Sequence, residues 1–479
     1  MKGEIIMLPT PRNYAIWPAV VCAGKVSHMT ITAVERAFLP FADAQYQLKI
    51  LAVNGDETDN YVDPVTHTHL TLVGKDGALE FDFNFEEEML YKIQLYKDEK
   101  LLEEMQVYAL EKDLYALTPL RGDLHSHSYR SDGRRDPAAL AGHYREQGYD
   151  FFALTDHNRY WVGGEIDETY AEVDTGFARV RGEEVHTPGC LVHIVHVGGE
   201  KSVAEKYVKD REGYEQEVAE CLARVPETVP EQYRDRYARV MWATENIHAV
   251  GGLAIFAHPY WCPAGSQVYN VHDKFARILM MSGMFDAFEA CGGIGQVANN
   301  RQLALWNDLR AEGLKLPAVS SSDVHKINGS ASFPHCFTIC FAEKNENDAI
   351  VSSIKNGLCV AVEGTGDEYR RQYRCYGSLR LVSYAHFLLA NYFQPMQRLC
   401  QGTGVMMRAY AMEECPRSVV DGTTKVCRNW SARFFGRKAP LLPGEKVRDF
   451  EDKWREKQLA GPHTKGSQIY LSDKVTRQI

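Results

Sequence analysis

The sequence lacks the marks of a secreted or membrane-embedded protein. No long apolar run follows the first methionine, so we expect no secretory signal peptide. The most apolar late stretch, 379–393, is shorter than the roughly 20 residues that a membrane span needs. Basic residues are also scarce: 54 Lys and Arg stand against 64 Asp and Glu, for a net charge of −10. This balance argues against a protein whose main task is to coat nucleic acid or acidic lipid.

Paired cysteines are missing as well. The 12 cysteines include no CxxC pair and no regular spacing, and the closest two, Cys336 and Cys340, are separated by strand-like sequence. Scattered cysteines in a long chain are usually reduced thiols. We therefore expect a reducing compartment and a cytoplasmic location.

Two common nucleotide and hydrolase motifs are absent, namely a GKS/T P-loop and a GxSxG elbow. One dinucleotide-like pattern is present, formed by Gly293, Gly295 and Ala298. It is a single copy inside a series of metal-type motifs. We therefore expect these glycines to form a tight loop rather than a cofactor site.

The length of 479 residues predicts two or three domains, on a prior of roughly 150 residues per domain. Residues 1–118 alternate between apolar and polar positions with turn signals such as Asn54-Gly55 and Asp76-Gly77, which predicts an antiparallel β-sandwich-like domain. A pair of histidines here, His67 and His69, has no acidic neighbour and is interpreted as surface strand. Residues 119–365 alternate strands with helices, with a helical insertion at about 202–250. Residues 366–479 form a C-terminal extension of uncertain structure, with a charged surface helix expected at 449–457.

Histidines gather in the middle of the chain, where 11 of the 17 lie between His125 and His325. His125 and His127 are two apart on a predicted strand and so face the same side. Asp132 follows in a Ser-Asp-Gly turn that can return its carboxylate to the same point. Imidazole with carboxylate suits zinc, iron or manganese. Taken alone, the pair fits a surface strand equally well, and the rest of the chain decides between the two interpretations.

Further ligand-type residues stand at the ends of apolar strands. They occur in Thr155-Asp-His157, Gly182-Glu-Glu184, Ala257-His-Pro259 and Ser322-Asp-Val-His325. In a parallel α/β barrel, the loops after the strands gather at one end and form the active site. A single metal cluster explains this placement better than scattered structural histidines do.

The ordered set of motifs resembles the PHP (polymerase and histidinol phosphatase) superfamily of metal-dependent phosphoesterases over about residues 119–365. The β-rich lead into Arg121-Gly-Asp-Leu-His125 is similar to the CehA/McbA-type branch. The resemblance implies an α/β fold with a distorted seven-stranded (β/α) barrel that holds two or three divalent ions of zinc, manganese or iron.

The resemblance also implies a ligand set. One ion would be bound by His125, His127, Asp323 and Glu184; a second would share Glu184 and take His193 and His258; a third would take Asp132, His157 and His325. Glu183 is the alternative to Glu184, because neighbours on a strand face opposite ways. His196 is expected to be packed or to support a ligand, and His186 is a further candidate. Asp156, Glu184 and His193 are the predicted catalytic residues, and Asp156 and Glu289 are expected to orient ligands.

Substrate contacts are predicted beside these ligands. Arg134, Arg159 and Lys326, with Arg135 as a further candidate, can hold a phosphate, although solvated surface is the alternative for each. Many relatives have an arginine after His-Pro, where this chain has Tyr260 and Trp261. We therefore predict contact with Tyr260 and an aromatic or bulkier substrate.

The sequence thus predicts a metal-dependent hydrolase in which a metal-bridging hydroxide attacks a phosphomonoester or phosphodiester. The alternatives are a carboxylic ester or amide hydrolase on the same site, and a metal-binding module without catalysis. The expected partner is a small-molecule substrate. Nucleic acid is not favoured, and no membrane partner is expected.

Overall fold

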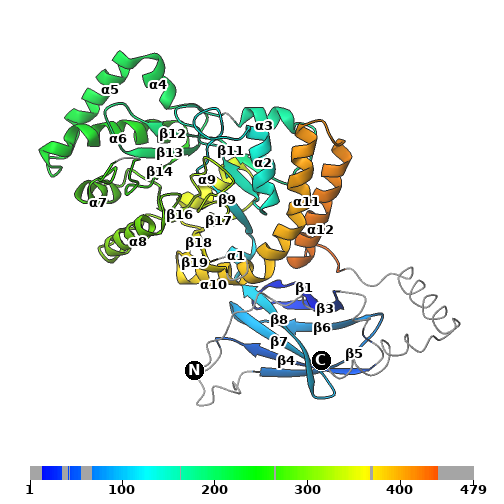
Figure 1. The fold of residues 1–479 in the computed structure, drawn as a ribbon. Coiled ribbons are helices and arrows are strands. Elements are labelled where there is room, and N and C mark those ends of the chain that lie inside the picture. The colour runs from blue at the N-terminus through cyan, green and yellow to red at the C-terminus, as the bar shows by residue number, and fades with distance from the viewer. Residues whose placement is uncertain are drawn as a thin grey trace.

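The computed structural model describes residues 13–34, 41, 44–54, 67–161, 163–263, 266–366 and 371–440. The N-terminal strands form one part of the molecule, and the mixed α/β part lies beside it with the last helices packed along its flank (Figure 1). The helix predicted at 449–457 lies outside the described residues.

The N-terminal part is built from two sheets that share one core. The first has the order β1-β3-β6 and the second β2-β8-β7-β4-β5, and every pairing is antiparallel except β2 with β8. Side chains from both sheets, such as Met29 and Ile93, are fully buried between them, which confirms the prediction of a β-rich N-terminal part. The strands are β1 Tyr14–Trp17, β2 Val20–Cys22, β3 Val26–Ala33, β4 Gln45–Ala52, β5 His67–Val73, β6 Ala78–Asn84, β7 Met89–Lys97 and β8 Lys100–Leu110.

The α/β part contains a six-stranded sheet of order β11-β10-β9-β17-β18-β19. β9, β10 and β11 are parallel, whereas β17, β18 and β19 join antiparallel. The strands are β9 Thr118–Asp123, β10 Phe151–Ala153, β11 Ala178–Val180, β17 Cys336–Ala342, β18 Cys359–Thr365 and β19 Gln372–Tyr376.

A five-stranded sheet of order β12-β13-β14-β15-β16 faces it. Its strands are β12 Gly182–His186, β13 His193–Gly198, β14 Gly252–Phe256, β15 Ala287–Cys291 and β16 Ala318–Ser320. Both sheets contribute buried side chains to one core, for example Phe151 and Ile255. Two isolated parallel bridges, Ser126 with Val324 and His157 with Glu184, connect segments that follow the strands. The predicted α/β class is confirmed, while closure into a single seven-stranded barrel stays a prediction.

Helices flank these sheets. Asp136 caps α2, accepting hydrogen bonds from the backbone N–H groups of Ala138 and Ala139. Gly295 precedes α8 with a φ of 91°, a conformation that glycine adopts without strain. The helices are α1 Lys112–Tyr115, α2 Pro137–Glu146, α3 Gly164–Thr169, α4 Ala204–Lys209, α5 Arg211–Ala223, α6 Glu231–Ala249, α7 Asp273–Met281, α8 Gln296–Ala311 and α9 Asn347–Lys355. Three of these, α4 to α6, fall within the predicted helical insertion.

The C-terminal extension begins with β19, which joins the six-stranded sheet, and its described part is helical after that strand. This helical part comprises α10 Leu379–Leu388, a π-helical turn η1 Leu389–Phe393, α11 Gln394–Ala411 and α12 Arg417–Phe434. α11 packs closely on α2. The close approach is seen at Gly404, where an added Cβ would lie 2.2 Å from the backbone nitrogen of Glu146. Among the described helices, none is both long and apolar enough to cross a bilayer.

Candidate metal centre

The carboxylate of Glu184, in the middle of β12, lies at the centre of the site. It is buried, and each of its oxygens faces three imidazoles. Oε2 lies 2.9 Å from His157 Nδ1, 3.3 Å from His125 Nε2 and 3.4 Å from His127 Nε2. Oε1 lies 3.1 Å from both His186 Nε2 and His193 Nδ1, and 3.4 Å from His258 Nε2.

Two aspartates extend this cluster. Asp323 Oδ1 lies 3.1 Å from His127 Nε2 and 3.4 Å from His125 Nε2. Asp132 Oδ1 lies 3.3 Å from His325 Nε2 and 3.4 Å from His157 Nε2. Asp132 Oδ1 also lies 3.9 Å from His127 Nδ1, so the turn returns the carboxylate to a histidine of the segment that follows β9.

All nine predicted ligands are thus brought together, although they span 201 positions of the chain from His125 to His325. Groups of ligand atoms within 4.8 Å of one another include His125 with His127 and Asp323, Glu184 with His193 and His258, and Asp132 with His127, His157 and His325. Of two further groups, one includes His186 and the other includes Glu289. Which side chain binds which ion stays a prediction.

The donor atoms of this cluster fit divalent cations. Several buried atoms have no hydrogen-bond partner among the described residues, including both nitrogens of His127, Nε2 of His125, Nδ1 of His193 and Oε1 of Glu184. Buried polar atoms without partners are costly, and a bound cation would satisfy them together. Imidazole and carboxylate ligands suit zinc, manganese and iron.

The pKa values of Glu184 and His193 are shifted in the directions that suit metal ligands. Burial alone would raise the pKa of the Glu184 carboxyl, but the surrounding imidazoles, His125 foremost, hold it well below its usual range. Burial lowers the pKa of His193 to about 4. The carboxylate is therefore ionised and the imidazole neutral at pH 7, as metal coordination requires.

Two of the predicted ligands have unusual backbone conformations. His258 has a φ of 23° and Asp323 a φ of 49°. Positive φ is uncommon for residues other than glycine, and such strain is concentrated at functional sites. The fold holds both side chains against the cluster in spite of this cost.

Glu183 and His196 lie on the other side of these strands. His196 Nδ1 lies 3.1 Å from Glu183 Oε1, and both are fully buried. Glu183 also accepts hydrogen bonds from Ser202 Oγ at 2.7 Å and the backbone N–H of Val203 at 2.6 Å. Glu184 and His193, rather than Glu183 and His196, therefore face the cluster.

Supporting acids surround the ligands. Glu289 Oε2 lies 2.9 Å from His125 Nδ1, in the orienting position predicted for it. Asp156 accepts hydrogen bonds from Ser128 and from Ser131, on the loop between His127 and Asp132. No ion pair or hydrogen bond to an imidazole is found for Asp156 among the described residues, so its geometry favours positioning of that loop. Its predicted catalytic role stays untested.

Sequence analysis missed Asp123. This carboxylate is fully buried and accepts hydrogen bonds from the backbone N–H of His125 at 3.2 Å, the backbone N–H of Ser322 at 3.0 Å and Tyr144 Oη at 2.7 Å. It therefore ties together the two segments that carry His125 and Asp323. The available signal was an acid at the end of β9, two residues before His125, the first histidine of the cluster.

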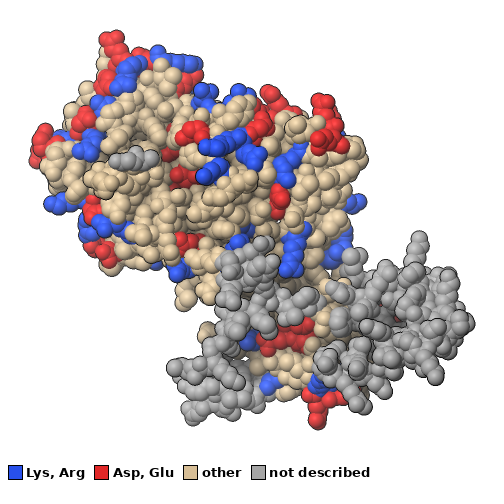
Figure 2. All heavy atoms as spheres, viewed as in Figure 1, with Lys and Arg blue, Asp and Glu red and all other residues tan. Residues whose placement is uncertain are grey.

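The predicted cationic contacts lie at the surface beside the cluster. Arg134, Arg159 and Lys326 are exposed, and their side chains form no ion pair or hydrogen bond with other described residues. The backbone N–H of Arg134 donates to the carbonyl of His325 at 2.9 Å, and that of Arg159 to the carbonyl of Asp156 at 3.2 Å. On the visible face, basic and acidic side chains are interspersed (Figure 2).

Of the two aromatic residues after His258, Trp261 lies beside the cluster. Its ring centroid is 5.5 Å from that of His193 and 6.2 Å from that of His258. Tyr260 is buried, with its ring 5.2 Å from that of Tyr269. The contact predicted for Tyr260 stays untested, but the structure places its neighbour closer to the histidines.

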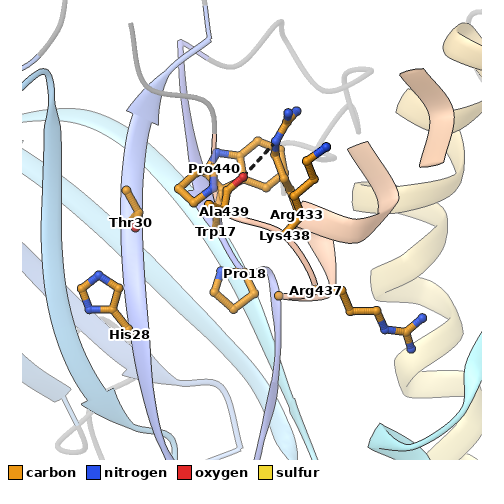
Figure 3. A pocket seen from close by; sticks show the side chains of 10 residues that line it. Trp17, Pro18, His28, Thr30, Arg433, Arg437, Lys438, Ala439 and Pro440 are labelled. Atoms are coloured by element: carbon orange, nitrogen blue, oxygen red, sulfur yellow. Dashed lines mark hydrogen bonds between the residues drawn. The ribbon is translucent and has the colours of Figure 1, made fainter. Parts of the chain in front are cut away.

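A separate cavity of about 350 Å³ lies where β1 and β3 meet the end of α12. Figure 3 shows Trp17, Pro18, His28 and Thr30 on one side and Arg433, Arg437 and Lys438 on the other. The lining includes none of the predicted site residues. It is therefore distinct from the histidine cluster.

Comparison with known proteins supports the same assignment. No protein-family model matches the chain. It is 27% identical over 266 residues to a 5'-3' exoribonuclease of Haemophilus influenzae, a match that covers 42% of this chain and 89% of the relative. With the ligand clusters, this relative bears out the predicted resemblance to PHP-type metal-dependent phosphoesterases.

Solved structures show weaker likenesses. One is a two-domain Bacteroides vulgatus protein described as containing a predicted PHP-like metal-dependent phosphoesterase, with 18% identity and a TM-score of 0.35 over 51% of this chain. The match spans 65% of that protein, just under two thirds of its length. Another is an amidohydrolase from Chromobacterium violaceum, with 21% identity and a TM-score of 0.31 over 44% of this chain and 89% of that one.

Proposed function

We propose, from the similarity of this chain to PHP-type enzymes, that it is a phosphoesterase that hydrolyses a phosphomonoester or phosphodiester with two or three divalent ions. One observation carries the proposal: the two oxygens of Glu184 each face three imidazoles within 3.4 Å. A carboxylate shared in this way suits a bridge between cations. Neutral imidazoles alone would not supply the charge to hold several cations close together.

The ligands are assigned as the family resemblance implies. His125, His127, Asp323 and Glu184 would hold one ion, Glu184, His193 and His258 a second, and Asp132, His157 and His325 a third. The groupings of ligand atoms support this division. When bound, divalent ions lower the pKa of coordinated water and neutralise charge that develops on a phosphoryl oxygen.

The residues around the ligands fix their geometry. Glu289 holds His125 through Nδ1, which directs Nε2 toward Glu184 and Asp323. Asp123 holds the backbone of the segments that carry His125 and Asp323. Asp156 holds the loop between His127 and Asp132. Catalytic roles for Glu184, His193 and Asp156 are part of the proposal.

Substrate recognition is assigned to the exposed cations. Arg134 and Arg159 lie next to ligand segments and have no described side-chain partner, so they are available to phosphate oxygens. Lys326 directly follows His325. These groups favour an anionic ester over a neutral carboxylic ester.

The architecture suits this chemistry if the two facing sheets act as a distorted seven-stranded barrel. We propose domain limits of 1–118 for the β-sandwich-like part, 119–365 for the barrel and 366–479 for the C-terminal extension. The shared core between the sheets supports the barrel arrangement.

The substrate class is tested with a panel. The Haemophilus relative is named a 5'-3' exoribonuclease, so short RNA belongs beside p-nitrophenyl phosphate, bis(p-nitrophenyl) phosphate and p-nitrophenyl acetate. Each is assayed with manganese, iron and zinc. We expect turnover of a phosphoester that depends on added metal.

The test variant is Glu184→Gln, and its control is Glu227→Gln, at an exposed position between α5 and α6. Turnover should be lost only in Glu184→Gln. Hydrolysis of the acetate alone would favour the carboxylic ester alternative. A protein that binds no metal and cannot be loaded would contradict the proposal.

A further inference from the structure

Trp261 differs from Trp242 and Trp306 in the environment of its indole ring. Trp242 and Trp306 are buried, and their indole N–H groups donate to Glu217 Oε2 at 2.8 Å and to the carbonyl of Leu316 at 2.9 Å. Trp261 is only partly buried, and its indole N–H makes no hydrogen bond with any residue that the structure describes. A large ring is thus left partly open to solvent at the edge of the metal cluster.

The backbone around Trp261 holds this ring in place. Its N–H donates to the carbonyl of His258 at 2.9 Å, and its carbonyl accepts from the N–H of Asn270 at 2.8 Å. The side-chain amide of Asn270 donates to the carbonyl of Leu191. The ring therefore sits on a tied loop that begins at a predicted ligand, rather than on a free surface side chain.

Apolar side chains continue the surface around it. Leu191 is 61% exposed and Tyr269 is 41% exposed, and each lies next to a residue of this hydrogen-bonded loop. On another side of the cluster stand the exposed cations Arg134 and Lys326. The entrance to the cluster thus combines aromatic and apolar side chains with positive charge.

We propose that Trp261 is a specificity-determining residue that stacks on a flat aromatic ring, such as a nucleobase, in the non-reacting part of the phosphoester. This rests on the proposed function, because the phosphate must lie at the histidine cluster for the ring to reach Trp261. Aromatic side chains stack on every base through its π-face and need no sequence-specific hydrogen bond. Binding energy from the remote part of a substrate can then assist reaction at the phosphate.

The test compares two substrates with the same reacting group. Adenosine 5'-monophosphate and ribose 5-phosphate share the 5'-phosphate and the ribose, and differ in the base. We expect Trp261→Ala to lower kcat/KM for the first on the order of tenfold or more. Ribose 5-phosphate should be unaffected, and Trp261→Phe should retain most of the activity on the nucleotide because it keeps a ring. A dinucleotide and its abasic counterpart form the matching diester pair.

A binding measurement gives a second readout that needs no turnover. Adenosine 5'-monophosphate should quench the intrinsic fluorescence of the wild-type protein, whereas ribose 5-phosphate should not. The quenching should disappear in Trp261→Phe and persist in Trp430→Phe. Trp430 is a suitable control because it lies on α12, packed on Tyr392 and Trp17.

The outcomes separate this inference from the proposed function. If the wild-type protein hydrolyses neither member of either pair, the proposed function fails, and the fluorescence measurement still decides the role of Trp261. A different outcome is that the wild-type protein hydrolyses substrates both with and without the base. In that case the inference is overturned if Trp261→Ala changes kcat/KM for both substrates equally or for neither. Quenching that persists in Trp261→Phe would also overturn it.

Discussion

Glu183 and Glu184 are consecutive on β12, yet their carboxylates serve different structures. Glu184 is surrounded by six imidazoles, whereas Glu183 bonds to His196 and to the backbone at the start of α4. The alternation of side chains along a strand separates them. The strand pairing places Glu183 opposite His196, and His186 opposite His193, on β13.

This pair gives the sharpest test of the metal centre. Glu184→Gln should lose bound metal and turnover while the fold is kept, because it removes the shared charged ligand. Glu183→Gln should retain metal but lower the free energy of unfolding, because it weakens a buried hydrogen-bond network. Elemental analysis, turnover and urea unfolding of both variants distinguish these results. Equal metal content in the two variants would contradict the assignment.

Glu289 should tune the affinity for metal. Its carboxylate lies 2.9 Å from His125 Nδ1, and loss of such a partner typically weakens metal affinity by about 10–100-fold. We expect a change of this size in Glu289→Gln, measured by competition with a chelator. The control is Glu363→Gln, a buried acid on β18 whose carboxylate is within 3.4 Å of Asn299 Nδ2. An equal loss in the control would show a general effect of buried acids.

Chelation should destabilise the native protein. Ions that bind only the folded chain stabilise it by about 2.7 kcal/mol when their concentration is 100 times the Kd. We therefore expect EDTA to lower Tm in thermal unfolding, and manganese or zinc to restore it. The variant Glu184→Gln should respond much less. A Tm of the wild-type protein that ignores both treatments would argue against a metal centre.

Two glycines of α11 should respond oppositely to alanine. A Cβ on Gly404 would lie 2.2 Å from the backbone nitrogen of Glu146, whereas a Cβ on Gly402 would have nothing within 4 Å. Overpacking costs about 1–3 kcal/mol, while Gly→Ala at an open helical position stabilises by about 0.5–1 kcal/mol. We expect Gly404→Ala to unfold at lower urea concentration than the wild type and Gly402→Ala at higher. If Gly404→Ala is as stable as the wild type, α11 does not pack on α2 as closely as described.

His143 on α2 should contribute to acid sensitivity. Burial, with the positive charges of Arg408 and Arg135, lowers its pKa from 6.5 to about 4. Between these values the unfolded chain binds a proton that the folded chain does not, so stability falls as the pH drops through this range. The free energy of unfolding should therefore decrease less from pH 7 to pH 5 in His143→Gln than in the wild type. Urea titrations at both pH values measure this, and identical decreases would refute it.

Local sequence was enough to predict much of the site and the fold class. Two histidines at i and i+2, and acids and histidines at strand ends, each reflect geometry within a few residues. The same local alternation predicted the β-rich N-terminal part. The ordered motifs then indicated the resemblance to PHP-type enzymes, which the Haemophilus relative confirms.

Where either of two neighbouring residues could fill the same role, the sequence alone did not decide between them. The alternation of side chains along a strand predicts that Glu183 and Glu184 face opposite sides. It does not predict which side holds the cluster, so Glu184 was chosen from the family resemblance. Tyr260 was predicted to contact substrate, yet Trp261 lies nearer to the histidines. Asp123 was not predicted because its role depends on Ser322, which is 199 residues away in the sequence.

Residue type and short-range spacing fix the available ligands and the local elements that carry them, so the chemistry of the site follows from the amino-acid order. The folded arrangement sets which of two adjacent side chains meets the cluster, how the C-terminal helices pack, and which acids support the ligands. These depend on contacts between segments far apart in the chain, whose free energies come from packing and hydrogen bonding that no local pattern records.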